Sequence, residues 1–591
     1  MSLLVEYTDP EWRGLNMRTL GVDQAYMYLR SEYAQHSFLY TLSDECYTCP
    51  YTKVKALPAA GSGQQLQPLQ LSTAYALNFK IFQHDQGRYA FENVVIKPFN
   101  IIPCHSTYCK SSSLCWLRRT DLQEFGVYNL TLLANGSCDF AVDKPGVPIN
   151  YAFLSVFVLV AAVLILLKLG SYAWRCHRYD EAAAAADSIG AAAAKATQRK
   201  RMRSLDTFRG LSIVLMIFVN SGGGGYAWIE HAAWNGLNLA DLVFPSFLWI
   251  MGVCIPLSVK AQLSRGNSKA RICLRILWRS IKLFAFGLCL NSMTGPSLEQ
   301  LRLMGVLQRF GIAFLVVGIL HTLCSRREQV LPQSAWHRAI YDVCLFSGEL
   351  AVLLALIAAY LGMTFGLPVP GCPRGYLGPG GKHDLAAHPN CIGGAAGYVD
   401  QQVLGNAHIY QHPTAKYVYD SSAFDPEGVF GCLLSIVQVF LGAFAGLTLL
   451  VHPTWQSRIR RWLLLSILLG LMGGVLCGFS REGGVIPVNK NLWSLSFVFA
   501  TVSVAQLLLV LLYYIIDVGD GWWSGWPFSE CGMNAIIMYV GHSVLHKMLP
   551  WHWRIGAMNT HFVLLLECTW NTFLWVGIAL YLDAHEFYYS L

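Results

Sequence analysis

The stretch that decides the fold runs from Arg203 to Lys260 and reads RSLDTFRGLSIVLMIFVNSGGGGYAWIEHAAWNGLNLADLVFPSFLWIMGVCIPLSVK. Two apolar runs in it, 211–219 and 237–259, lie on either side of a polar turn that is rich in glycine. The second run carries Asp241 inside apolar sequence. A central aspartate costs on the order of 3 kcal/mol in a bilayer, so such a group indicates a protein-lined or wet cavity. This stretch is therefore the first candidate for an active site.

The composition is typical of a polytopic α-helical membrane protein. Of the 591 residues, 54% are hydrophobic and 13% are charged. Many apolar runs approach the roughly 20 residues that a spanning helix needs. We expect about eleven transmembrane helices, at 151–169, 211–220, 239–259, 272–290, 304–322, 343–365, 429–451, 462–479, 492–516, 535–549 and 562–582.

Basic residues predict the orientation of these helices. They gather in the connections 175–203, 265–282, 326–338 and 458–461, and cytosolic loops retain Lys and Arg. The N-terminal segment and the loop 367–427 then lie in the lumen, and the C-terminus in the cytosol. The loop 517–527 departs from this trend, since it carries two aspartates and no basic residue. Topology explains the net charge of +8, and a cytosolic anionic ligand is a second explanation. No pattern indicates nucleic acid.

Residues 1–148 are predicted to form a luminal β domain. Alternation of period two at 75–82, 89–96 and 127–133 indicates short strands, and we expect a small β-sandwich. In an oxidising lumen its six cysteines would form disulfides of undetermined connectivity: Cys46, Cys49, Cys104, Cys109, Cys115 and Cys138. The CxxC spacing of the first two favours a structural disulfide over a redox motif. Further candidates are Cys372 and Cys391 for disulfides, and Asn129 and Asn135 for glycosylation.

The segments around the first helix complete the domain organisation. Residues 1–12 lack the charged and apolar regions of a signal peptide, and we expect that a signal has been lost upstream. The first transmembrane helix, within 149–170, leads to an alanine-rich connector at 171–203 that ends in QRKRMR. This connector is predicted to be a cytosolic linker helix or a disordered segment. Residues 204–591 then form a ten-helix domain.

His231 and Asn220 are the candidate catalytic residues of the glycine-rich stretch. An imidazole that titrates near neutral pH suits a general base or a nucleophile, and an amide suits an oxyanion. Acyl transfer is the reaction that this pair would serve. The alternative is that His231 is an interfacial histidine in an aromatic belt with Trp228 and Trp234. No HExxH or paired His/Cys spacing surrounds it, so we expect no metal.

Later helices carry three further polar clusters. These contain Gln308 and Arg309, then Asn489, Lys490, Asn491 and Trp493, then Asn534 and His542. Each cluster has an alternative interpretation as ordinary interhelical hydrogen bonding. No internal repeat is visible, which weakens the interpretation of the chain as a transporter built on inverted halves.

The central domain resembles a known family. The motifs that carry the resemblance are RSLDTFRG, the Asn-Ser-Gly-Gly-Gly turn, HAAWNGL, ADLVFP, IMG, VLQR, LPVPGCPRGYLGPGG, PNCIGGAAGY, YDSSAFDPEG, IPVNKNLWSLS and GMNAIIMYVGH. They closely resemble the heparan-alpha-glucosaminide N-acetyltransferases, a family of lysosomal membrane enzymes, over most of residues 203–542. The β segment and the alanine-rich connector match only in arrangement, and the absence of a signal peptide departs from the family.

The resemblance implies a reaction across the membrane. Acetyl-CoA would be held from the cytosolic side, and its acetyl group would move to the terminal non-reducing glucosamine of heparan sulfate in the acidic lysosomal lumen. The catalytic histidine and asparagine of the family fall on His231 and Asn220. Asp241 is the third candidate, either orienting His231 or binding sugar hydroxyls. Direct transfer and an acetyl-histidine intermediate both remain open. The resemblance also implies a homodimer.

Binding residues follow from the two substrates. The CoA phosphates predict binding by Arg203, Arg209, Arg275, Arg279 and Lys282 at the cytosolic face, although the positive-inside rule alone explains these cations too. Arg309 is a further cofactor-binding candidate. The predicted sugar-binding set is Trp234, Lys490, Asn491, Trp493 and His542. Lys490 and Arg481 would meet uronate carboxylates, or else are solvated loop cations. The competing functions are a transporter of a sugar or acyl donor and a luminal receptor.

Overall fold

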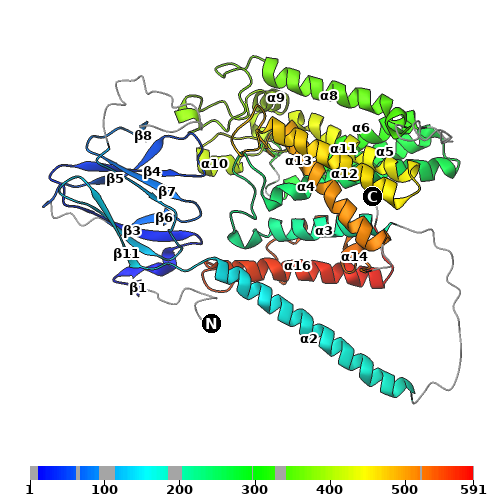
Figure 1. Ribbon diagram of the computed structural model, residues 1–591, viewed down its shortest axis with the longest axis horizontal. Helices are drawn as coiled ribbons and strands as arrows, with labels where there is room; N and C mark the ends of the chain where they lie inside the picture. The colour runs from blue at the N-terminus through cyan, green and yellow to red at the C-terminus, as the bar shows by residue number, and fades with distance from the viewer. Residues whose placement is uncertain are drawn as a thin grey trace.

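The computed structural model describes residues 11–61, 67–91, 113–183, 202–293, 295, 297–325, 341–518 and 522–589. A β domain forms one end of the molecule and a bundle of helices forms the other (Figure 1). The predicted fold class, a helical membrane protein with an N-terminal β-rich region, is therefore confirmed.

The β domain contains two main sheets and a small hairpin. The hairpin pairs β1 (Glu11–Trp12) with β2 (Leu15–Asn16). The four-stranded sheet has the order β11 (Cys138–Lys144), β10 (Val127–Leu132), β3 (Gln24–Ser31) and β6 (Leu69–Ser72). The five-stranded sheet has the order β8 (Tyr89–Ala90), β5 (Tyr51–Leu57), β4 (Ser37–Ser43), β7 (Leu77–Phe82) and β9 (Cys115–Arg119).

The two sheets share one apolar core. Alternate residues of β10, namely Tyr128, Leu130 and Leu132, are buried in the same cluster as Leu39 and Phe79 of the other sheet. Apolar residues at every second position place one face of each strand inward. The alternation at 127–133 and 75–82 therefore predicted β10 and β7 correctly. At 89–96 the short strand β8 forms, and 92–96 lies outside the described residues.

Three of the expected disulfides are present. Cys46 pairs with Cys49, Cys115 with Cys138, and Cys372 with Cys391, at Cα–Cα distances of 5.5, 5.8 and 5.7 Å. The second of these links β9 to β11 and so joins the two sheets. Cys104 and Cys109 lie outside the described residues.

The two glycosylation acceptors differ in exposure. Asn135 is exposed in the turn between β10 and β11. Asn129 lies within β10, with its side-chain oxygen shielded from solvent. Because a glycan needs a surface position, Asn135 is the better placed acceptor.

Eight helices among the described residues are long and apolar enough to cross a membrane. They are the 150–170 part of α2 (Asn150–Ala183), α4 (Leu239–Ser264), α6 (Val306–Cys324), α8 (Ser347–Gly366), α11 (Val429–Val451), α12 (Trp455–Leu476), α13 (Leu495–Tyr513) with its π-helical end Tyr514–Val518, and α16 (His561–Ala584). The predicted count of about eleven is not confirmed. The remaining predicted spans correspond to the more charged helices α3 (Arg203–Asn220) and α5 (Lys269–Ser292) and to the short α15 (Ala535–Val544).

Other short helices connect the bundle. These are α9 (Ala395–Leu404) and α10 (Thr414–Tyr419) in the loop 367–427, and α14 (Phe528–Met533) beside α3. The first helix α2 continues to Ala183, so the early part of the predicted connector is helical. Residues 184–201 of that connector and the whole basic connection 326–338 lie outside the described residues. Arg203, which was expected to end a loop, is the first residue of α3.

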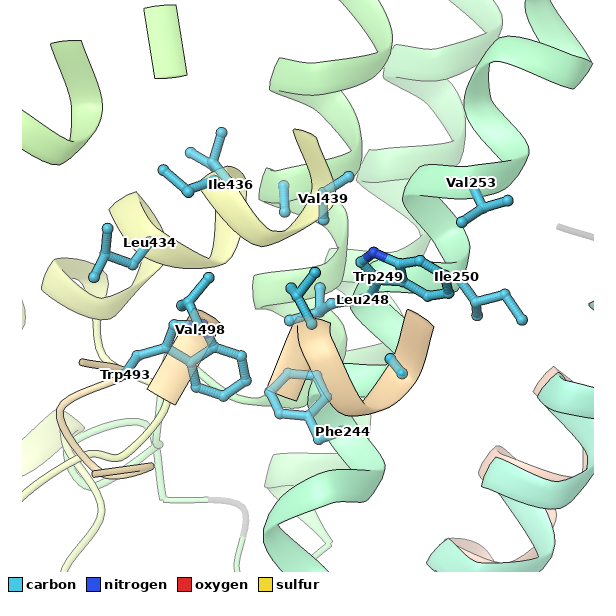
Figure 2. Close-up of a cluster of buried hydrophobic side chains, with 14 of the residues drawn as sticks. Phe244, Leu248, Trp249, Ile250, Val253, Leu434, Ile436, Val439, Trp493 and Val498 are labelled. Atoms are coloured by element: carbon cyan, nitrogen blue, oxygen red, sulfur yellow. The ribbon is translucent and has the colours of Figure 1, made fainter. Parts of the chain in front are cut away.

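The helix α4 lies at the centre of the bundle. Phe244, Leu248 and Trp249 of α4 lie in a buried cluster with residues of α11 and α13 (Figure 2). Helices α4 and α11 approach backbone to backbone, because a Cβ atom added at Gly252 or Gly442 would lie 2.2 or 2.1 Å from a carbonyl oxygen of the other helix. Small residues permit such close packing in membranes. The first turn of α4, which carries Asp241, is thereby held in place.

Polar contacts attach the β domain to the bundle. His561, the first residue of α16, places Nε2 3.1 Å from Asp23 Oδ1 and 3.6 Å from Glu124 Oε2. Its Nδ1 lies 2.8 Å from the carbonyl oxygen of Gly224. These three titratable side chains form a largely buried cluster between the domains.

Replacing Glu124 by glutamine is expected to flatten the dependence of stability on pH. Burial raises the pKa of Glu124 to about 7 from its ordinary 4.5, against the opposing effect of His561. A raised pKa means that the buried carboxyl adds stability below pH 4.5 and that this stability is lost as the pH rises towards 7. The loss is about 3 kcal/mol. Thermal unfolding in detergent across this range would measure it, with the exposed Asp139→Asn as control. Equal slopes for wild type and Glu124→Gln would contradict the expectation.

Candidate active site

The loop 221–238 between α3 and α4 positions His231. It leaves α3 through Gly222, Gly223 and Gly224, whose φ angles are 101°, 53° and 74°. Only glycine adopts such left-handed backbone readily. At Gly224 a side chain would also clash, because an added Cβ would lie 2.9 Å from Leu565. The glycine run seen in the sequence is therefore required to turn the chain tightly beside α16.

His231 and Asp241 form a hydrogen-bonded pair. His231 Nδ1 lies 2.7 Å from Asp241 Oδ1. The other carboxylate oxygen accepts hydrogen bonds from the backbone N–H groups of Asn238 at 3.0 Å and Ala232 at 3.2 Å. The aspartate side chain is 1% exposed, whereas the imidazole is 34% exposed. A carboxylate only accepts, so Nδ1 carries the hydrogen and Nε2 keeps a free lone pair.

Lys490 lies over the imidazole ring. Its Nζ is 3.1 Å from Nε2 and 3.3 Å from Nδ1 of His231. The nearly equal distances place the ammonium over the face of the ring, so the in-plane lone pair of Nε2 stays accessible. Burial and the charge of Lys490 lower the pKa of His231, although the hydrogen bond to Asp241 acts in the opposite direction. His231 is therefore neutral in more acidic solution than an ordinary histidine.

Replacing Lys490 by methionine is expected to move the acid limb of the pH–rate profile to higher pH. The sequence predicts His231 as a base, and a base must be neutral to act, so on this prediction activity falls as the pH drops through the pKa of His231. Removing the lysine charge raises that pKa, because Lys490 lowers it in the wild type. A profile of kcat/KM against pH would measure the shift, with the exposed Lys416→Met as control. An unmoved limb in Lys490→Met would show that the lysine does not act on His231.

A pair of asparagines brings the Lys490 segment to the His231 loop. Asn489 donates from Nδ2 to Asn235 Oδ1 at 2.9 Å, and Asn235 donates in turn to Glu482 at 2.6 Å. The backbone N–H of Gly236 donates to the carbonyl of Val488 at 2.8 Å. Asn235 and Asn489 belong to the sequence motifs HAAWNGL and IPVNKNLWS, but their partnership was not predicted.

A second polar network lies near Lys490, and sequence reasoning missed it. Arg302 donates to Asp425 at 2.9 and 2.5 Å and to Glu427 at 2.6 Å, and its guanidinium lies 4.7 Å from the ring centre of Tyr410. Burial opposes ionisation of Glu427, but Arg302 and then Lys490 outweigh it and lower the pKa of this carboxyl. The acidic pair in the motif YDSSAFDPEG was the available signal.

Asn220 is the last residue of α3 and contacts another predicted site residue. Its Nδ2 lies 3.0 Å from Nε2 of His542, so the structure pairs two predicted site residues with each other. No hydrogen bond between Asn220 and His231 occurs among the described residues. His542 is itself buried, with Nδ1 3.0 Å from the carbonyl of Met538.

Three other predicted sugar-binding residues are buried. Trp234 donates from Nε1 to the carbonyl of Leu377 at 2.8 Å and packs against Phe424. Trp493 packs between Phe244 and the guanidinium of Arg309. Asn491 is buried beside it. Only Lys490 of this predicted set contacts His231 directly in the described structure.

Two adjoining cavities enter the bundle beside α5. One has a volume of about 370 Å³ and the other about 500 Å³. Both are lined by Ile255, Ser258, Arg279 and Phe314, so the two cavities adjoin and are together called the recess below. The larger cavity adds the basic side chains of Arg271, Arg275 and Lys282. The smaller cavity is mainly apolar, with Phe247, Phe310 and Tyr539 in its wall.

The predicted CoA-binding residues divide between this recess and other places. Those that line it are Arg209, Arg275, Arg279 and Lys282. Arg203 is exposed at the start of α3 and lines neither cavity. Arg309 is fully buried and donates to the carbonyl of Gly428 at 2.9 Å, so it is also absent from the recess. Arg271 was missed, because nothing in the sequence separates it from the other basic residues of its loop.

The arrangement defines a class of protein. A multi-span bundle carries an oriented histidine at one place and a recess with a basic mouth and apolar walls at another. An imidazole fixed by a carboxylate is the form in which histidine acts as base or nucleophile. The recess matches the chemistry of a long ligand with an anionic end. Fold and site together are those of a membrane-embedded group-transfer enzyme.

Comparison with known proteins identifies the family. Residues 201–335 match the family model described as heparan-alpha-glucosaminide N-acetyltransferase, catalytic. Proteins named heparan-alpha-glucosaminide N-acetyltransferase are similar to this chain. The Homo sapiens protein is 39% identical over 508 residues, covering 79% of this chain and 76% of its own length. The Mus musculus protein is 35% identical over 613 residues, covering 97% and 89%.

The chain therefore belongs to the heparan-alpha-glucosaminide N-acetyltransferase family and is an acetyltransferase. The resemblance inferred from the motifs is confirmed. Asn220, His231 and Asp241 all lie inside the range that the family model matches. The expectation that no metal takes part stays a prediction.

Proposed function

We propose that this protein transfers the acetyl group of cytosolic acetyl-CoA to the amino group of the terminal non-reducing α-glucosamine of heparan sulfate. His231 serves as base or acetyl acceptor, and Asn220 stabilises the reacting carbonyl. The observation that carries the proposal is the 2.7 Å bond between His231 Nδ1 and Asp241, which leaves Nε2 free on a partly exposed ring.

The acceptor needs a base. A glucosamine amine is protonated in an acidic compartment, and an ammonium cannot attack a thioester until it loses a proton. Neutral His231 takes this proton at Nε2, and the carboxylate of Asp241 stabilises the imidazolium that forms. The lowered pKa of His231 keeps more of the base neutral in acid. In a two-step route the same Nε2 would carry the acetyl group.

Asn220 retains a hydrogen for the oxyanion. An amide NH₂ group has two hydrogens, and the bond to His542 uses one of them. The second can donate to the thioester oxygen as negative charge develops on it. In this proposal His542 orients Asn220 in the way that Asp241 orients His231.

The donor fits the recess beside α5. Its basic mouth supplies Arg271, Arg275, Arg279 and Lys282 for the phosphates of CoA. Its apolar inner wall suits the pantetheine arm, which has no charge. The inner wall includes Phe247 and Phe310, and Phe310 packs against Phe244, one turn of α4 from Asp241. This continuity supports delivery of the thioester towards the luminal site.

The proposed function also requires a particular compartment and orientation in the membrane. We propose a lysosomal location, with the β domain and the loop 367–427 in the lumen and the C-terminus in the cytosol. The three described disulfides belong to those two luminal parts, as expected in an oxidising compartment. The basic mouth of the recess would then face the cytosol. By family resemblance we also propose a homodimer.

Sealed proteoliposomes test the function. Labelled acetyl-CoA is supplied at the face that carries the basic mouth, and glucosamine is enclosed on the other side. The expected product is labelled N-acetylglucosamine inside, with free CoA left outside. A transporter would instead move unreacted sugar or acyl donor across the membrane. Uptake of either one without N-acetylglucosamine would overturn the proposal.

Replacing Arg275 by glutamine is expected to raise the KM for acetyl-CoA about tenfold with little change in kcat. A phosphate contact made equally in the ground state and the transition state contributes to binding alone. Arg275 is exposed in the mouth of the recess, so its loss should not disturb the fold. Initial rates over a range of acetyl-CoA concentrations measure the effect. The exposed Arg265→Gln is the matched control, and an equal rise there would exclude a specific contact.

A further inference from the structure

The described site contains an amine of its own. The Nζ atom of Lys490 lies 3.1 Å from Nε2 of His231, which is within reach of proton transfer. The same Nε2 is the proposed base for the amine of the sugar. A lysine side chain is flexible, so a small rotation moves Nζ from the ring face to the lone pair of Nε2. Nε2 of His231 can therefore accept a proton from either of two amines, that of the glucosamine substrate or that of Lys490.

We propose that Lys490 is a site of self-acetylation, which proceeds when acetyl-CoA is bound and no sugar acceptor is present. This inference rests on the proposed function, because it needs the thioester to reach His231. The ammonium of Lys490 gives a proton to Nε2, which releases it to water at the partly exposed ring, and the neutral amine attacks the thioester carbonyl. A C–N bond forms and the C–S bond breaks. Nε2 takes the second proton from the attacking nitrogen and passes it to the CoA thiolate as that leaves. The products are N-acetyl-lysine, CoA as the thiol and one proton released to water.

The position of Lys490 is built into the site. Its neighbour Asn489 is buried, accepts from the backbone N–H of Leu492 at 2.8 Å, and donates to Asn235 of the His231 loop. The segment that carries the lysine is therefore fixed against the segment that carries the base. The charge of Lys490 also lowers the pKa of Glu427, which belongs to a third segment. The hydrogen bonds of Asn489 hold the amine where the proposed reaction takes place.

Lysine acetylation at this place would close the site. An amide does not pass its acetyl group on under conditions where a thioester does, so the reaction is a dead end. The acetylated side chain loses its charge and gains bulk directly over His231. The sugar acceptor would protect the enzyme, because it occupies the base and consumes the thioester. We therefore expect the enzyme to lose activity when it is held with donor alone.

Mass spectrometry of the full-length protein in detergent tests the proposal. Wild-type enzyme is incubated with acetyl-CoA, with and without saturating glucosamine, and the peptide containing residue 490 is analysed. Acetylation of Lys490 is expected without glucosamine, and about tenfold less with it. The His231→Gln variant should acetylate Lys490 about 100-fold more slowly. Lys490→Arg keeps the charge and should lack the modification.

Lys382 serves as an internal reference within the same samples. Burial lowers the pKa of Lys382, so its neutral amine is more abundant than that of an ordinary lysine. Among the described residues it makes no hydrogen bond to a histidine ring. If acetylation were merely chemical, Lys382 would be modified as strongly as Lys490 and independently of His231. That result would overturn the proposal.

The remaining outcomes separate this inference from the proposed function. Acetylated glucosamine together with unmodified Lys490 would overturn self-acetylation and leave the proposed function in place. Unmodified glucosamine together with unmodified Lys490 would overturn both. Acetyl-Lys490 that depends on His231 and is suppressed by glucosamine supports both.

Discussion

Replacing His231 by alanine is expected to lower acetyl transfer to glucosamine by a factor of about 1,000, because general-base catalysis contributes about 10²–10⁴. The imidazole is the one group in the described site that combines a free nitrogen lone pair with a carboxylate partner at 2.7 Å. Binding of acetyl-CoA should persist, since His231 does not line the recess beside α5. Product formation and donor binding are measured on the same membrane preparation.

A matched control separates catalysis from folding. His412 is exposed in the loop 367–427, and His412→Ala should leave transfer unchanged. If His231→Ala kept more than a tenth of wild-type activity, the base would have to be another residue. His542, which is hydrogen-bonded to Asn220, would then be the next candidate.

Replacing Asp241 by asparagine is expected to lower the rate by about 10²–10³. An amide at this place can donate to Nδ1, which favours the tautomer whose hydrogen lies on Nε2, and that tautomer cannot act as a base. The amide also removes the charge that stabilises the imidazolium. The carboxylate further accepts two backbone N–H groups of the loop, so thermal stability must be measured alongside the rate.

The pH profile distinguishes this effect from a merely structural one. Asp241 raises the pKa of His231, whereas Lys490 lowers it. The residual activity of Asp241→Asn should therefore show an acid limb displaced to lower pH, opposite to the shift expected for Lys490→Met. A general loosening of the loop would not displace the acid limbs of the two variants in opposite directions. If the acid limbs of Asp241→Asn and Lys490→Met moved in the same direction, the assignment of His231 as the titrating base would be contradicted.

Local sequence patterns predicted the elements of this fold well. Period-two alternation placed β7 and β10, and long apolar runs placed α4, α11 and α16 to within a few residues. These patterns work because each records which face of one element is buried. The glycine run and Asp241 likewise indicated an unusual turn beside a polar cavity. Each of these signals lies within a single stretch of chain.

Local sequence patterns could not predict which residues contact each other within the site. Lys490 contacts a histidine 259 positions earlier, and Arg302 contacts Asp425 across 123 positions. Helix packing decides which loops meet, and no local periodicity records it. The contact between Asn220 at the end of α3 and His542 in α15 was likewise not predicted. The joint action of Asn220 and His231 stays a prediction.

Arg309 was predicted to bind CoA but does not line the recess. It belongs to the motif VLQR near the start of α6, and a cation there suggested a phosphate contact. Val306 and Phe310 on the same helix line the recess, whereas the side chain of Arg309 contacts Trp493 and the carbonyl of Gly428. Helix packing decides which neighbours a side chain meets. A single charge therefore says little about a site until its neighbours are known.

The helix α4 reaches both halves of the enzyme. Asp241 in its first turn is hydrogen-bonded to the proposed base, His231, and Ser258 near its other end lines the recess proposed for the donor. The close backbone contact between α4 and α11 at Gly252 and Gly442 keeps the two helices from shifting past each other. A shift of this rigid helix at one end therefore also moves its other end. Relatives that change donor preference should carry compensating changes around the sugar. A redesign of either end of α4 has to include the other end.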